Sequence, residues 1–267
     1  MIAAIAHLGL MDDEEIILDT AALELSALDH DGVDMAPYLA TVVDLANDLG
    51  SYADAADPAG QADGLVEVIA GSYGFRGDSE SYDVPLNADM IRVLDRRRGL
   101  PIALSILYVA LARRIGWSAD ILDVPGHVLV RLGVAEDAVT IDPFNGGALV
   151  GRHQLVALLH RMLGPDATVD RYPVLPMSNR MILARLLRNQ ARRAESANDL
   201  ERARIVNERI VTVAPADQQG WWDLARMQLA LGRGDDARLS LSAMLEMTRD
   251  GAIRMRIAAA LDTLAAR

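Results

Sequence analysis

The chain has 267 residues, of which 51% are hydrophobic and 24% charged, as expected for a folded globular protein. It contains no cysteine, which excludes disulfides, thiolate metal sites and any thiol nucleophile. Its net charge of −12 argues against nucleic-acid binding. No apolar run approaches the roughly 20 residues that span a bilayer, and no basic segment typical of a secretory signal opens the chain. We therefore expect a cytoplasmic protein that binds neither membrane nor nucleic acid.

The charge is unevenly distributed along the chain. Residues 1–177 carry 27 acidic residues and 11 arginines, a net charge of −16. Residues 178–267 carry 11 acidic residues and 15 arginines, a net charge of +4. The basic second part is suited to the acidic first part of the chain or to an acidic partner, and a solvated helical surface is the alternative interpretation of its arginines.

The N-terminal quarter of the chain predicts helices. Residues 35–49 show apolar side chains at helical spacing, and residues 65–70 suggest another helix. Residues 71–85 are rich in Gly, Ser and Asp and predict a loop. Either Asn87 or Asp89 is placed to cap a short helix that follows the loop.

The clearest helix covers residues 101–115, where almost every residue up to 112 is apolar, so we expect it to be buried in the domain centre. Three strand-like runs follow it, and a further helix and a linker come next. These are strands 119–124, 127–132 and 138–142, helix 151–163 and a linker over 166–177. The linker separates a domain of residues 1–165 from one of residues 178–267.

The second domain predicts helices only, with a repeat. One constant shift along the sequence aligns Ala191 with Ala225 and Ala203 with Ala237. This helix-turn-helix period of 34 is that of tetratricopeptide repeats, which stack into a concave binding surface. A generic helical bundle with accidental register is the alternative.

A hairpin brings together the best candidate side chains. If residues 133–136 form a four-residue turn, Val128 faces Ile141 and His127 faces Asp142 on the opposite face. Directly opposed residues have Cβ atoms about 4.5–5.5 Å apart, so an imidazole–carboxylate hydrogen bond is within reach. Such a pair either orients a catalytic ring or simply ties two strands together.

A nucleophile for this pair would sit at the start of helix 101–115, where Pro101 stands instead. Proline suits the first turn of a helix without any function. Ser105 lies one turn further along the same face, and a Ser105-His127-Asp142 triad is the alternative. Against it, a helical serine usually bonds its own backbone.

Four motifs in order resemble the bacterial SirB regulator family. They are Gly74-Phe75-Arg76-Gly77-Asp78, the segment from Val93 to Ser105, Pro125-Gly126-His127-Val128-Leu129-Val130-Arg131, and Ile141-Asp142-Pro143-Phe144-Asn145-Gly146-Gly147. Members pair a transglutaminase-like domain with tetratricopeptide repeats. The resemblance implies an α+β, papain-like fold with a small antiparallel sheet and a helical N-terminal region, followed by an all-α domain. His127 and Asp142 match the His and Asp of the wider transglutaminase-like pattern, whereas Pro101 stands where that pattern has Cys.

We therefore expect a non-catalytic regulator that binds a protein or peptide partner, with no metal and no cofactor. Alternatives are a Ser105 hydrolase and a structural remnant in which the His–Asp pair only adds stability. Residues assigned to the cleft are Phe75, Arg76, Asp78, Ser105, His127, Asp142 and Asn145. Residues assigned to partner binding are Trp221, Trp222 and Arg188.

Overall fold

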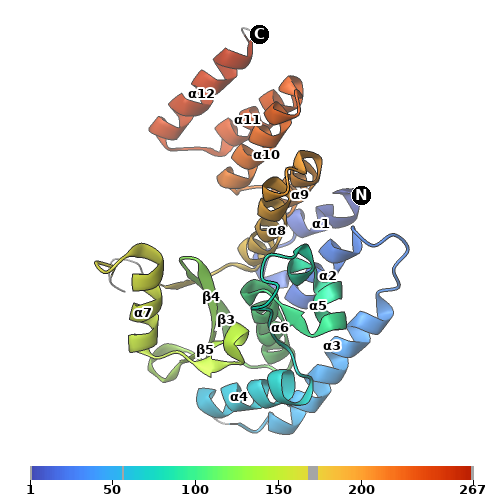
Figure 1. Cartoon of the computed structure of the whole chain (residues 1–267), viewed down its shortest axis with the longest axis vertical. Coiled ribbons are helices and arrows are strands. Elements are labelled where there is room, and N and C mark those ends of the chain that lie inside the picture. The colour runs from blue at the N-terminus through green and yellow to red at the C-terminus, as the bar shows by residue number, and fades with distance from the viewer. Residues whose placement is uncertain (1, 56, 168–173, 266–267) are drawn as a thin grey trace. The chain divides into compact units, whose positions relative to one another are not determined.

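The computed structural model describes residues 2–55, 57–167 and 174–265 (Figure 1). It divides into two compact units. The core unit comprises Glu14–Ile182, and the helical unit comprises Met1–Asp13 together with Leu183–Arg267.

The core unit begins with helices that surround one buried helix. They are α2 (Leu18–Ala27), α3 (Ala36–Leu49), α4 (Pro58–Leu65) and α5 (Met90–Arg96). Of the two candidate caps for α5, Asp89 is the residue used, because its carboxylate accepts hydrogen bonds from the backbone N–H groups of Ile91 and Arg92. Such a cap satisfies N–H groups that have no partner within the helix.

Helix α6 (Pro101–Arg114) forms the centre of the core unit, as its apolar sequence predicts. Every residue from Pro101 to Ala112 is buried. Its basic end is anchored by Arg114, which donates two hydrogen bonds to the buried carboxylate of Asp19 in α2. The start of α6 follows β2 (Arg98–Gly99), which pairs in parallel with β1 (Arg76–Gly77).

The second sheet has five antiparallel strands in the order β6-β5-β4-β3-β7. The strands are β3 (Ala119–Val124), β4 (His127–Leu132), β5 (Val139–Asp142), β6 (Ala148–Leu149) and β7 (Leu175–Pro176). Pro125 and Gly126 connect β3 to β4, and Gly126 has a φ of +71°. Proline followed by a left-handed glycine is a sequence typical of a type II turn.

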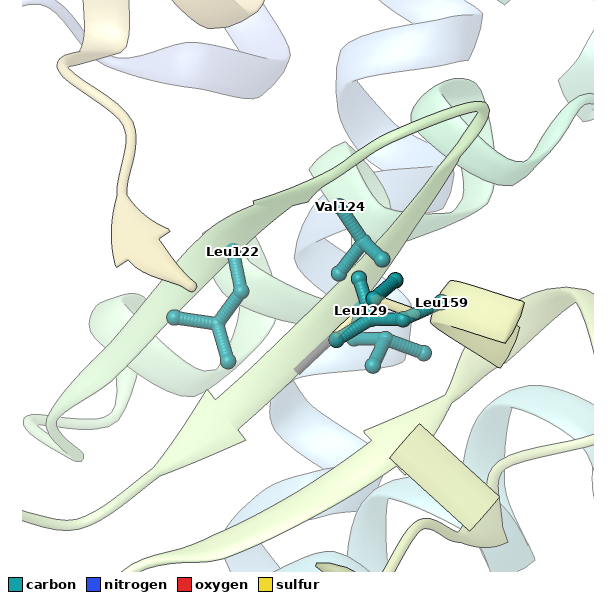
Figure 2. Packing of buried hydrophobic residues seen from close by; sticks show 5 residues of the cluster. Leu122, Val124, Leu129 and Leu159 are labelled. Carbon is teal, nitrogen blue, oxygen red and sulfur yellow. The ribbon is translucent and has the colours of Figure 1, made fainter. Parts of the chain in front are cut away.

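Helices cover both faces of this sheet (Figure 1). Leu122, Val124 and Leu129 form one cluster with Leu159 of α7 (Arg152–Leu163), as Figure 2 shows. Side chains alternate along a strand, so Val128 and its neighbours at every second position face the other way. That opposite face lies against α6, which contacts β3 and β4.

The register of β4 and β5 differs from the predicted one by two residues. Val130, not Val128, faces Ile141. The turn is longer than four residues because a 3₁₀ turn over Ala135–Asp137 lies within it. A slip of two residues leaves every side chain on its predicted face, since the strand period is two.

The helical unit contains α1 (Ala6–Leu10) and the helices from α8 onward. These are α8 (Asn179–Ser196), α9 (Leu200–Val213), α10 (Gln218–Ala230), α11 (Gly234–Met247) and α12 (Gly251–Ala265), of which the first four residues of α8 belong to the core unit. The ends of α8 and α10 differ by 34 in residue number, and so do the ends of α9 and α11. The chain therefore shows the 34-residue spacing of helices that the sequence predicts.

The compact units do not coincide with the domains expected from the sequence. The segment Met1–Asp13 groups with the C-terminal helices because α1 packs on α9, where the backbone oxygen of Thr212 leaves no room for a Cβ at Gly9. The boundary lies after Ile182, inside α8. Part of the expected linker, residues 168–173, lies outside the described residues, and another part forms β7 by pairing with β3.

Candidate functional site

The site is built around a hydrogen bond between two strand ends. His127 is the first residue of β4 and Asp142 the last of β5. The distance from His127 Nε2 to Asp142 Oδ2 is 2.9 Å. Both side chains are nearly buried, with exposed fractions of 13% and 11%. The predicted pairing of these two residues is therefore present in the structure.

Asp142 also organises the turn that follows it. Its carboxylate accepts hydrogen bonds from the backbone N–H groups of Phe144 and Asn145, and from the side-chain amide of Asn145 at 2.7 Å. Burial alone would raise the pKa of Asp142, but hydrogen bonds from His127 and Asn145 outweigh it and hold the pKa below its usual value. Asp142 is thus an ionised anchor for both the ring and the turn.

Aromatic rings complete the site. Phe144 packs edge-on against the His127 ring, with centroids 6.5 Å apart, and against Tyr82, with centroids 5.7 Å apart. Gly77 lets this ring approach, since a Cβ there would collide with the backbone oxygen and ring of Phe144. Sequence reasoning missed the roles of Phe144 and Tyr82. The sequence did contain a signal for Phe144, because it stands between Asp142 and Asn145 and is one of only two phenylalanines in the chain.

The structure does not assemble the alternative serine triad. Ser105 is completely buried, and its Oγ has no hydrogen-bond partner among the described residues. The strand alternation explains this. His127 lies on the sheet face of Leu122 and Leu129, which α7 covers, whereas Ser105 belongs to α6 on the other face. Pro101 is buried at the start of α6.

The loop residues assigned to the cleft have separate environments. Phe75 is 1% exposed and belongs to the core. Arg76 is exposed. The carboxylate of Asp78 is buried and accepts hydrogen bonds from Arg96, at 2.9 Å, and from the backbone of Ser81. Burial would raise the pKa of Asp78, but these bonds, with a contribution from the Asn87 side chain, bring it below its usual value. Asp78 therefore holds its loop in place.

In the helical unit, the three residues assigned to partner binding also have different environments. Trp221 donates a hydrogen bond from Nε1 to the Pro215 backbone oxygen, and Arg188 forms an ion pair with Asp217. Trp222 lines a pocket of about 320 Å³ between α10, α11 and α12. Trp222 thus lies at a hollow in the surface, whereas Trp221 and Arg188 are held by contacts within their own unit.

The part of the chain that the structure describes shows neither a metal-binding group nor a membrane-spanning helix. Within it, no three or more His, Cys, Asp or Glu side chains are arranged to hold a metal ion. Within the same residues, no helix combines the length and apolarity needed to cross a bilayer.

The sequence profile of the transglutaminase-like superfamily matches residues 36–188. The chain belongs to this superfamily. This span includes His127, Asp142 and the α6 segment that starts at Pro101. The site therefore lies within the part of the chain that matches the superfamily. Within this span His127 and Asp142 form a hydrogen-bonded pair, and the chain contains no cysteine.

Relatives agree with this assignment. A UPF0162 protein of Xylella fastidiosa is 33% identical over 177 residues, which are 65% of this chain and 63% of the relative. The match thus spans less than two thirds of that relative. A UPF0162 protein of Pseudomonas aeruginosa is 26% identical over 97% of this chain and 95% of its own length. Among solved structures, menin covers 91% of this chain and 69% of its own at 12% identity, with a TM-score of 0.41.

Proposed function

We propose that this protein is a non-catalytic transglutaminase-like protein that binds a peptide or protein partner. The observation that carries the proposal is the start of α6. A thiol enzyme of this kind needs a cysteine at a helix N-terminus, where the helix dipole lowers the thiol pKa. This chain has Pro101 there and no cysteine elsewhere.

Partner binding is supported by the C-terminal helices. Their 34-residue spacing is that of tetratricopeptide repeats, which bind peptides on a concave surface. The pocket beside Trp222 adds a place for a side chain of the partner. A regulatory role of the SirB type and a cytoplasmic location belong to the same proposal, and the second rests on the cysteine-free sequence.

Activity-based labelling tests the non-catalytic half of the proposal. The purified chain is treated with a fluorophosphonate and, separately, with a panel of activated esters and amides. We expect no adduct by intact mass and no turnover above that of the His127→Ala variant. A single adduct that is lost in both Ser105→Ala and His127→Ala, with both variants folded, would overturn the proposal in favour of a hydrolase.

A further inference from the structure

The pocket of the helical unit has an apolar wall. Met244 of α11 and Ile257 of α12 are buried, and Ile253 and Trp222 are half-buried beside them. All four belong to the apolar cluster that joins α10, α11 and α12. The wall is therefore fixed by the packing of the unit. An apolar side chain placed against it would be shielded from water, which favours binding.

One cation lies at this pocket. The guanidinium of Arg256 is 5.9 Å from the centre of the Trp222 ring. Its side chain is exposed and has no carboxylate partner among the described residues. Two other exposed arginines of the same unit do have carboxylate partners, since Arg226 pairs with Glu195 and Arg233 with Glu201. The charge of Arg256 is thus available to a ligand.

The other end of the pocket is also favourable to an anion. Gln218 and Gln219, which line it, are the first two residues of the 13-residue helix α10. Backbone N–H groups in the first turn of a helix lack partners within the helix and carry partial positive charge. The preceding carboxylate, Asp217, is paired with Arg188. Among the residues that the structure describes, Arg256 is the one charged side chain that lines this pocket.

We propose that this pocket binds an acidic peptide segment of a protein partner, in which an apolar side chain stands beside Asp or Glu. The apolar side chain packs against Trp222 and Ile257, and the carboxylate pairs with Arg256. A guanidinium and a carboxylate form a strong, charge-assisted hydrogen bond. This inference rests on the proposed binding function and specifies the partner's chemistry.

A selection experiment on the full-length chain tests the assignment. Random 12-residue peptides displayed on phage are selected against the purified protein. The enriched peptides are synthesised with amidated C-termini, so that only side-chain carboxylates remain. Their affinities for the wild type, Arg256→Ala, Arg256→Glu and Arg249→Ala are measured by fluorescence anisotropy. Arg249→Ala is the matched control, because Arg249 is also exposed and does not line the pocket.

We expect the enriched peptides to combine an apolar residue with neighbouring Asp or Glu. Arg256→Ala should weaken their binding by about tenfold or more, because it removes a hydrogen bond between charged groups. Arg256→Glu should weaken binding further. Arg249→Ala should change it by less than about twofold. Circular dichroism verifies that each variant is folded.

Two outcomes would overturn the inference and separate it from the broader proposal. Enriched peptides that lack acidic residues, or that bind Arg256→Ala as well as wild type, would refute this pocket's role and leave partner binding in place. Enrichment no higher than that of an unrelated protein would refute both the inference and the proposed binding function.

Discussion

His127 Nε2 lies 2.9 Å from Asp142 Oδ2, although the two residues do not face each other across their strands. With Val130 opposite Ile141, His127 extends beyond the end of β5 and reaches Asp142 along a diagonal. A diagonal neighbour on the same sheet face is within reach of a long side chain. The contact therefore depends on the face that the residues share, and not on direct opposition.

Asp142→Asn should make the free energy of unfolding less dependent on pH in the acidic range. Because the folded pKa of Asp142 is below its usual value, the folded state favours the carboxylate. That contribution is complete above the unfolded pKa of about 3.9 and is lost as the pH falls through the lower folded pKa. At pH 7 we expect the free energy of unfolding to fall by roughly 1–3 kcal/mol in the variant.

Urea unfolding of wild type and variant between pH 7 and pH 3 measures this difference. The two curves should converge below pH ~4. A difference of the same size at every pH would show that the charge of Asp142 has no role. Asp31→Asn, at an exposed position, is the control and should change stability by less than about 0.5 kcal/mol.

Ser105→Ala and Ser26→Ala form a matched pair of buried substitutions. Ser105 Oγ has no partner among the described residues, so removing it should leave stability unchanged or raise it by up to about 1 kcal/mol. Ser26 is equally buried, but its Oγ accepts the backbone N–H of Met90 at 2.8 Å. Ser26→Ala should therefore cost roughly 1–3 kcal/mol, because that N–H loses its partner. Chemical denaturation compares them, and a larger loss for Ser105→Ala would contradict the structure.

Arg96→Ala should destabilise the core unit. Arg96 donates to Asp78, whose side chain is 3% exposed, and to Asn87. Without Arg96 the buried carboxylate loses its charged partner, so we expect a loss of roughly 1–3 kcal/mol. Arg92→Ala removes a surface pair with Asp95, in which the side chains are 45% and 40% exposed, and should cost less than about 0.5 kcal/mol. The stabilities of the two variants are compared by thermal and urea unfolding. If Arg96→Ala and Arg92→Ala lower stability equally, the buried ion pair contributes no more than the surface pair.

Gly77→Ala should disturb the aromatic part of the site. The added Cβ collides with Phe144, and relieving such overpacking costs about 1–3 kcal/mol. Gly50→Ala is the control, because Gly50 has a right-handed helical conformation and no atom within 4 Å of the place that an added methyl group would take. Its stability should be unchanged or higher by up to about 1 kcal/mol. A tolerated alanine at position 77 would mean that Phe144 moves easily.

Local sequence patterns were sufficient for much of the fold. The bounds of β3 and β4 match the predicted strands, and α6 starts at Pro101 as predicted. These elements have strong local signals, namely a Pro-Gly turn between strands and a long apolar helix. The face shared by His127 and Asp142 followed from strand alternation, and that is why this part of the site was predictable.

Features set by contacts distant in sequence were not predictable in this way. The β4–β5 register depends on a 3₁₀ turn without a clear signal, and burial of Ser105 away from His127 depends on which sheet face α6 covers. The role of Asp78 depends on Arg96, which lies beyond the intervening loop. A single sequence gives the type of an element more readily than its partners.

The grouping of Met1–Asp13 with the C-terminal helices has a consequence for synthesis of the chain. On the ribosome, α1 is made before the core unit, but its packing partner α9 is made about 190 residues later. The intervening core unit is continuous in sequence and can fold as its residues emerge. Helix α1 then stays without its packing partner until α9 has been made, so the helical unit is completed only after the core unit.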